Sequence, residues 1–290
     1  MSLQSSDLEM VKGLQIQTVD AGWTTPISDE VWVRLYADTR PRHHLITNLQ
    51  KGLILVSNRK ELVGEGIGLG VPAVRYRNRT YFSGSSSVKF EQTRTHATAI
   101  KKFTLDLISE RILRSTHVET ATYRRIGRSF AELYKKHKHL RLLMIENLLR
   151  HIGVKTDFVH TTPAGTATMT YRIARSRIKI KAEFELPHQS GLQKIYLLNE
   201  QGSKHFRKYS DSTGTVLFDK AIGAWEIVNA DWACVHSVED KVGFRLWKLE
   251  EATLYKGREF LDGIFDWVGL DYEANPGTTC FEYDIELVRR

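Results

Sequence analysis

The sequence contains very little cysteine, with only two such residues in 290. Cys234 and Cys280 sit in apolar, strand-like surroundings, so we expect two buried free thiols rather than a disulfide framework or a cysteine-ligated metal. Long apolar runs are also missing, because no stretch approaches the roughly eighteen residues that a membrane helix requires. The polar N-terminus lacks a basic region followed by an apolar core and predicts no secretory signal. These absences predict a soluble, cytoplasmic protein with no membrane contact.

No spacing of histidine, cysteine and carboxylate residues indicates a metal or cofactor site. His43 and His44 are adjacent, and neighbouring side chains on a strand point to opposite faces. His137 and His139 are two residues apart, which separates their imidazoles on a helix. The sequence therefore predicts neither a metal nor a cofactor.

Acidic residues are fewer than basic ones, and the formal net charge is +8 with a pI near 9.4. A charge of this sign favours polyanions such as nucleic acid, acidic polysaccharide or phosphorylated metabolites. Much of the excess lies between residues 124 and 150, and a basic helix face is more often simply a solvated face. The sequence thus favours a solvated helix, with nucleic-acid or polyanion binding by residues 124–141 as the alternative.

Alternation of apolar and polar residues with a period of two dominates the chain and predicts β-strands. It is clearest in residues 177–186, where one face is expected in the core and the other in water. Residues 281–287 predict a strong final strand after the turn-forming segment 275–278. Further strands are predicted at residues 14–19, 31–36, 53–56, 102–112, 194–199 and 215–218, and residues 223–228, 232–238 and 242–249 are expected to form an antiparallel meander.

The period changes in one segment, about 119–152, where apolar residues recur every three or four positions and predict an amphipathic helix. Thr120 or Thr122 can cap its start and Gly153 can end it. No internal repeat or linker-like segment divides the chain. We therefore expect a single β-rich domain over 1–290: mainly β, a large antiparallel β-sandwich, with a central amphipathic helical segment.

Glycine is concentrated at every second position from Gly64 to Gly70. An extended segment of this kind has one side without side chains, so a backbone, a ring or a ligand can approach closely. The pattern superficially resembles a phosphate loop, but that fingerprint needs a strand before it and a helix after it. Residues 74–76 look extended instead, which argues against a nucleotide-binding loop.

Residues 73–82 predict a hairpin whose turn lies at Arg77-Asn78-Arg79, because asparagine tolerates the left-handed turn conformation. Arg75, Tyr76, Arg79 and Tyr81 would then lie within reach of one another. Such a group could hydrogen-bond an anion and stack on a ring. The alternative is a solvated hairpin tip with ordinary strand tyrosines.

The C-terminal part of the chain resembles a known fold. A long antiparallel series that closes with Asp271-Tyr272, then Asn275-Pro276-Gly277-Thr278, then the strand of Phe281 and Tyr283 looks like the end of a galactose mutarotase-like β-supersandwich. The resemblance implies a protein that binds or acts on carbohydrate. The epimerases of that group use a histidine acid and a glutamate base in local motifs that this sequence does not match, so no catalytic residue is carried over.

Chemistry on a sugar needs a proton donor, a proton acceptor and a flat apolar surface. The hypothesis from the sequence is a carbohydrate-active or carbohydrate-binding protein, with a uronate as one substrate that its arginines would suit. A non-enzymatic interaction protein is a further alternative, and no oligomeric state is predicted. The candidate catalytic residues are His236, Glu65 and Asp266, and the candidate substrate-binding residues are Arg75, Tyr76, Tyr81, Asp231 and Trp267.

Overall fold

A computed structural model describes most of the chain and allows these expectations to be compared with a fold. The predicted helix at 119–152, with its basic residues 124–141, lies outside the described residues, and so does Glu65. The described residues are 10–11, 14–15, 17–19, 22–26, 31–36, 50–64, 66–92, 96–106, 108–113, 155–160, 163–174, 176–187, 189–261 and 265–289.

The architecture is dominated by one antiparallel sheet of 14 strands. The mainly β fold expected from the alternating pattern is therefore confirmed. Across the sheet the strands are β17 (Val216–Phe218), β16 (Phe206–Asp211), β19 (Trp232–Ser237), β20 (Val242–Trp247), β23 (Cys280–Arg289), β14 (Arg177–Glu185), β13 (Gly165–Ala174), β10 (Ala97–Asp106), β9 (Arg79–Gln92), β8 (Gly68–Tyr76), β15 (Leu192–Gly202), β22 (Phe265–Ala274), β21 (Ala252–Leu261) and β18 (Glu226–Ile227).

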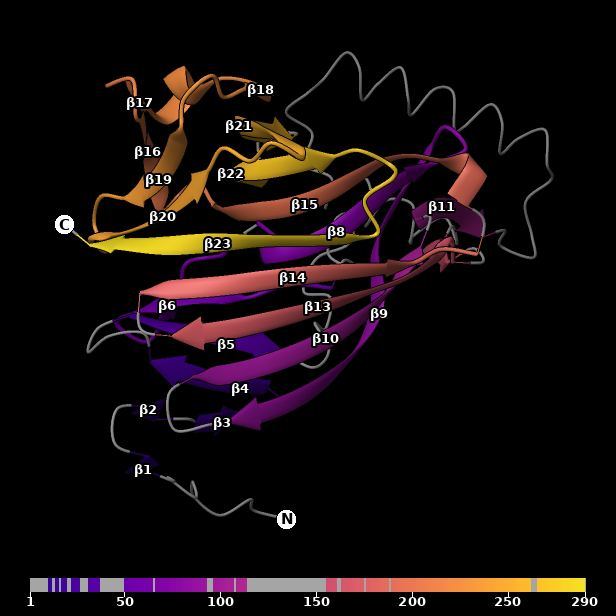
Figure 1. The fold of residues 1–290 in the computed structure, drawn as a ribbon, viewed down its shortest axis with the longest axis horizontal. Helices are drawn as coiled ribbons and strands as arrows, with labels where there is room; N and C mark the ends of the chain where they lie inside the picture. The colour runs from indigo at the N-terminus through magenta and orange to yellow at the C-terminus, as the bar shows by residue number, and fades with distance from the viewer. Residues whose placement is uncertain are drawn as a thin grey trace.

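A second sheet of five strands packs against the first. In Figure 1 its strands lie behind β13 and β10, and a β-bridge between Leu53 and Leu69 ties its region to β8. Its strands are β3 (Gln17–Val19), β4 (Gly22–Pro26), β5 (Val31–Tyr36), β6 (Ile54–Ser57) and β7 (Lys60–Glu61). The remaining elements are the pairs β1 (Met10–Val11) with β2 (Leu14–Gln15) and β11 (Ile108–Leu113) with β12 (Lys155–His160), and the 3-10 turns η1 (Gln189–Gly191) and η2 (Asp219–Ile222).

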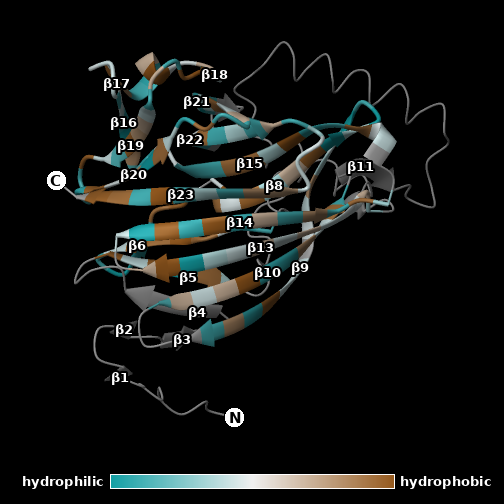
Figure 2. Cartoon of the chain, in the orientation of Figure 1, coloured by the Kyte–Doolittle hydropathy of each residue, from teal (hydrophilic) through white to brown (hydrophobic). Residues whose placement is uncertain are grey.

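Burial follows the sequence alternation along the individual strands. In β5 every second residue, beginning with Val31, is buried, and in β14 Ile178, Ile180 and Ala182 are fully buried between more exposed polar neighbours. Figure 2 shows hydrophobic and hydrophilic bands alternating along β14 and β23. The alternation with a period of two therefore correctly predicts that one face of these strands lies in the core.

The large sheet bends so that its two halves face each other and form the sandwich. Tyr171 of β13 donates from its hydroxyl to the Gly70 carbonyl of β8 at 2.7 Å. Tyr283 of β23 donates in the same way to Asn199 Oδ1 of β15 at 2.9 Å. Both bonds cross the interior between strands that are far apart in the sheet order. The long strand β9 joins the two halves, and a bulge in its pairing with β10 supplies the local bend.

The two edges of the large sheet come from one stretch of chain. β17 at one edge and β18 at the other are separated only by η2 and a short loop. Lys256 of β21 lies 5.2 Å from the ring centroid of Tyr209 in β16, so the two ends of the sheet are in contact. The expected meander over 223–249 is therefore wrong in one respect: β19 and β20 pair with each other, but β18 pairs with β21 at the opposite edge.

The core is one large cluster of apolar side chains contributed by both sheets. Cys234 is buried as expected, but Cys280 is exposed, because it begins β23 on the face opposite to the buried Phe281. Within the described ranges no helix is long and apolar enough to cross a membrane.

Candidate functional site

The predicted hairpin is present, but its side chains divide between two faces. β8 and β9 pair from Ala73 to Phe82, and Arg77 and Asn78 form the turn with φ of 47° and 62°. Tyr76 is buried and packs edge-on against Tyr81 at 6.2 Å between ring centroids. Arg75 is exposed on the other face of β8, and it is Arg77 that stacks on Tyr76, at 5.3 Å. The expected grouping of Arg75 with both tyrosines therefore does not form.

The candidate acid His236 lies on β19, where it is 6% exposed. Its Nε2 is 2.8 Å from Ser210 Oγ and its Nδ1 is 3.7 Å from Cys234 Sγ. Gly243 on the neighbouring strand leaves room for the imidazole, since a Cβ there would lie 2.7 Å from Nδ1. The candidate binding residue Asp231 precedes β19 and is exposed, with its backbone N–H donating to Ser212 Oγ.

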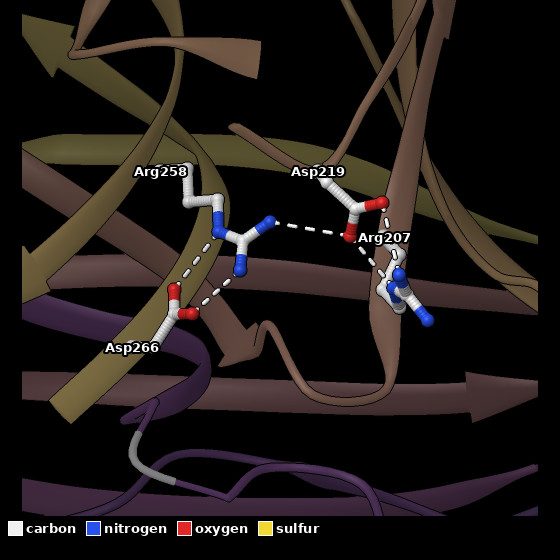
Figure 3. Close-up of polar contacts among 4 residues, drawn as sticks. All are labelled: Arg207, Asp219, Arg258 and Asp266. Carbon is white, nitrogen blue, oxygen red and sulfur yellow. Dashed lines mark hydrogen bonds and ion pairs between the residues drawn. The ribbon is translucent and has the colours of Figure 1, made fainter. Parts of the chain in front are cut away.

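The candidate acid Asp266 lies in an ion-pair network that joins the two ends of the large sheet (Figure 3). Arg258 of β21 donates from Nε and Nη2 to the two oxygens of Asp266, at 2.9 and 2.5 Å, and from Nη1 to Asp219. Asp219 also accepts from Arg207 of β16. Burial alone would raise the pKa of Asp266, but hydrogen bonds from Arg258 and Ser203 lower it below the ordinary value. A carboxylate held in its ionised form is poorly suited to donating a proton.

A different part of the sheet combines glycines with an isolated carboxyl group. On β15, Glu200 is paired with Gly68 of β8 on one side and with Gly269 of β22 on the other. Gly269 is in turn paired with Gly257 of β21. A Cβ at Gly269 would lie 3.0 Å from Glu200 Cγ, so the glycine makes room for this side chain. We call Gly68, Gly269 and Gly257 the glycine row.

A second carboxyl group lies beside the glycine row. Asp271 follows Gly269 by two positions on β22 and therefore projects from the same face of the strand. It is 7% exposed, and its Oδ1 accepts a hydrogen bond of 2.7 Å from the Asn199 backbone N–H. Burial raises the pKa of Asp271 to about 7, although that hydrogen bond opposes the shift.

The pKa of Glu200 is also raised, to well above its ordinary value. Burial is the main cause, and the neighbouring carboxyl groups of Asp271 and Glu259 add to it. Because like charges at close range resist simultaneous ionisation, the protons of such a pair belong to the pair rather than to either residue. Glu200 and Asp271 therefore form a coupled pair of carboxyl groups, in which Asp271 has a pKa of about 7 and Glu200 a pKa well above its ordinary value.

Two tryptophans lie near the glycine row. The Trp225 indole lies on Gly257, where a Cβ would be 2.5 Å from Trp225 Cδ2, and its Nε1 donates to Glu259 Oε2 at 3.1 Å. Trp267 precedes Gly269 by two positions on the same face of β22. It is 8% exposed, and its Nε1 has no hydrogen-bond partner in the described part of the chain. We call Glu200, Asp271, Glu259, Trp225 and Trp267, together with the glycine row, the carboxylate site.

Of the sequence-predicted residues that the structure describes, Trp267 is the one that lies in the carboxylate site. Arg75 lies on β8, the neighbour of β15 in the large sheet, but it pairs with Lys194 near the other end of β15. At about 3.3 Å per residue, it lies roughly 20 Å along the strand from Glu200. His236, on β19, contacts Ser210 and Cys234, which are not part of the carboxylate site. The catalytic roles of Glu65, His236 and Asp266 stay predictions. No group of three or more histidine, cysteine or carboxylate residues could hold a metal among the residues that the structure describes.

Sequence reasoning missed Glu200 and Asp271, although two signals pointed to the strands around Asp271. Gly257 and Gly269 fall inside strand patterns, where glycine often marks the close approach of a ligand or another backbone. Asp271 stands within an otherwise apolar run of β22, so that its carboxyl group must be buried. Neither signal shows that the two carboxyl groups meet, because that depends on the pairing of β15 with β22.

Comparison with known proteins gives only distant similarities. No protein-family model matches the chain, and no curated protein matches it. Among solved structures, an α-N-acetylgalactosaminidase from Bifidobacterium bifidum in complex with GalNAc is similar with a TM-score of 0.46 and 8% identity, over 94% of this chain and 36% of that one. An α-mannosidase from Enterococcus faecalis V583 has a TM-score of 0.42 and 9% identity, over 89% of this chain and 28% of that one.

A further similar structure is the Slr1438 protein from Synechocystis sp. PCC 6803, with a TM-score of 0.38 and 8% identity over 100% of both chains. This chain spans about a third of the length of the galactosaminidase structures that it matches. All of these TM-scores are too low for a fold or an activity to be carried over. The functional proposal below therefore depends on the geometry of the carboxylate site.

Proposed function

We propose that this chain binds a carbohydrate and acts on it by general acid–base chemistry, with Glu200 and Asp271 as the proton donor and acceptor. The observation that supports the proposal is the placement of this coupled pair of carboxyl groups beside Gly269, on neighbouring strands of the large sheet. The substrate screen below distinguishes an epimerisation, an elimination and a hydrolysis by their products.

The pair has the electrostatic properties that such chemistry needs. An efficient general acid or base has a pKa near the working pH, so that both of its protonation states are populated. Asp271, with a pKa of about 7, meets this condition at neutral pH. Glu200 is half-buried, so its carboxyl group is the one of the pair with more access to a ligand.

The surroundings of the pair suit a sugar in shape and polarity. An indole presents a flat apolar surface to the C–H face of a sugar ring and a polar N–H at its edge. Trp225 and Trp267 supply two such groups, and the Trp267 N–H has no protein partner among the described residues. Gly269 leaves room for the Glu200 side chain, and the Trp225 indole covers Gly257.

The proposal predicts that Glu200→Gln and Asp271→Asn each lower turnover by about 100-fold or more, in line with the usual contribution of one acid or base group. The measurement is a screen of neutral, acidic and amino glycans for product formation, followed by kinetics on any that react. Glu239→Gln is the matched control, because this carboxylate is exposed in the loop after β19, and it should retain full activity. Unchanged turnover in both site variants would refute the acid–base role.

The same assay tests whether the activity depends on the carboxylate site or on the catalytic residues predicted from the sequence. Under our assignment, His236→Ala and Asp266→Asn should keep most of the turnover of the wild-type protein, after correction for folded fraction. Loss of turnover in these variants, with retention in Glu200→Gln, would favour the sequence-based set instead. Sugar binding without any turnover would define a carbohydrate-binding protein and remove the catalytic role.

A further inference from the structure

Two tryptophans lie side by side on the face of the large sheet that points away from the core. Trp232 of β19 is paired with Trp247 of β20, and directly opposed residues of an antiparallel pair have Cβ atoms about 5 Å apart on the same face. Their neighbours along the two strands, Ala233 and Leu246, are fully buried in the core. The two indoles therefore project outward, and Trp247 is 43% exposed.

An arginine side chain contacts both indoles. The guanidinium carbon of Arg245 lies 4.2 Å from the ring centroid of Trp232 and 5.9 Å from that of Trp247. Its Nη1 donates to Glu286 Oε2 of β23 at 3.1 Å. The guanidinium is thus held by cation–π contacts and by an ion pair, with a carboxylate acceptor beside its N–H donors. We call Trp232, Arg245, Trp247 and Glu286 the tryptophan platform.

The backbone of the tryptophan platform is fixed at two points. The Tyr272 hydroxyl of β22 donates to the Trp247 carbonyl from the other half of the sheet. The Lys248 backbone N–H donates to the Asp231 carbonyl at 2.7 Å, which ties the end of β20 to the start of β19. A ligand that binds such a surface needs little ordering of the protein, so less of the interaction energy is lost on binding.

The size and the charge of the tryptophan platform indicate the class of its ligand. A stable protein interface covers about 800 Å² on each partner, far more than two indoles offer. Val216 and Phe218, which are also exposed, lie on β17, two strands from β19. The positive charge of Arg245 is compensated by Glu286, so a polyanion gains little from it. A small neutral ligand with hydroxyl groups therefore fits better than a protein or a nucleic acid.

A sugar matches the groups of the tryptophan platform. Its C–H face can stack on an indole, while its hydroxyl groups can accept from the guanidinium and donate to the carboxylate. We propose that the tryptophan platform is a second, non-catalytic binding surface for a neutral glycan. This inference goes beyond the proposed function, because it requires no reaction. The platform also shares no residue with the carboxylate site, whose coupled carboxyl groups are on β15 and β22.

The test is isothermal titration calorimetry of the full chain with neutral hexasaccharides of glucose, xylose and mannose. We expect Trp247→Ala to lower the affinity for the sugar that binds by about ten-fold, because one stacking contact on an indole is lost. Phe218→Ala is the matched control, since Phe218 is 51% exposed on the same face of the sheet. It lies roughly 16 Å from Trp232, counted along and across the strands, and its variant should bind like the wild-type protein.

Turnover separates the tryptophan platform from the carboxylate site. Trp247→Ala should keep the wild-type turnover of any short substrate that the screen finds, because this residue is not part of the carboxylate site. Glu200→Gln should lose turnover and keep the binding that Trp247→Ala removes. Equal binding by Trp247→Ala and the wild-type protein, or no binding of any of the three hexasaccharides, would overturn this inference, while turnover would still decide the proposed function.

Arg245→Lys tests the part that the guanidinium plays. Lysine keeps a positive charge for Glu286 but cannot stack flat on the Trp232 indole, so the affinity for the glycan should fall several-fold. Oligoproline and oligothymidylate serve as probes for a peptide and for a nucleic acid. Binding of either probe in place of the hexasaccharides, with loss of that binding in Trp247→Ala, would assign the platform to the other class of ligand and overturn the glycan inference.

Discussion

Asp271→Asn is expected to stabilise the protein at alkaline pH while removing its activity. The folded protein binds a proton at Asp271 with a pKa of about 7, against about 3.9 in an unfolded chain. The folded state therefore holds more protons between these values, and the free energy of unfolding falls as pH rises from about 4 to about 7. Asparagine cannot ionise, yet its Oδ1 can still accept from the Asn199 N–H. We expect a gain of about 2–4 kcal/mol at about pH 8.

The measurement is urea unfolding of both proteins at several pH values from about 4 to about 8. The two stability curves should approach each other at about pH 4, where Asp271 is protonated in the folded state and about half protonated in the unfolded state, and separate as the pH rises. Asp231→Asn should run parallel to the wild-type protein, since that side chain is exposed. Parallel curves for Asp271→Asn as well would show that Asp271 is ionised normally in the folded state.

Gly70→Ala is expected to lower the free energy of unfolding by about 2–5 kcal/mol. Gly70 has a φ of +70°, which costs a residue with a Cβ roughly 1–2 kcal/mol. A Cβ would also lie 2.8 Å from the Tyr171 ring and from Ile180 Cδ1, where overpacking typically costs about 1–3 kcal/mol. The two halves of the sandwich would have to separate locally, and the hydrogen bond from the Tyr171 hydroxyl to the Gly70 carbonyl would weaken.

Urea unfolding checks this expectation, with Gly277→Ala as the matched control. Gly277 lies in the turn before β23, and a Cβ there would meet nothing within 4 Å. The control should stay within about 0.5 kcal/mol of the wild-type protein. Equal stability of the two alanine variants would mean that the sandwich can open at Gly70 without cost.

The sequence predicted the fold class because the information that determines it is local. Alternation in β5, β14 and β23 directly encodes a strand with one buried face, and the glycine spacing correctly allowed a ring to approach at Gly70. The position of each strand in the sheet is not local. β18 pairs with β21 rather than continuing into β19, because its edge position depends on the closing of the whole sheet.

The carboxylate site could not be predicted from the sequence for the same reason. A glutamate in a strand normally marks the solvent face, and Glu200 carries no local signal that distinguishes it from such a residue. Its partners come from β22 and β21, and only the registers of these strands bring Gly269 and Asp271 beside it. The hairpin of Arg75 and Tyr76 was easier to find, because its turn is encoded by neighbouring residues, although two adjacent residues on a strand face opposite ways.

The ends of the large sheet have a consequence for association with other chains. A long open edge presents unpaired N–H and carbonyl groups and serves as a template for strand addition and aggregation. Here the sheet ends on β17 and β18, which have three and two residues. The segment between β17 and β18 is held against both ends of the sheet by ion pairs of Asp219 with Arg207 and Arg258. The protein thereby ends its sheet of 14 strands on two short strands, which shortens the edge on which a neighbouring molecule could extend it.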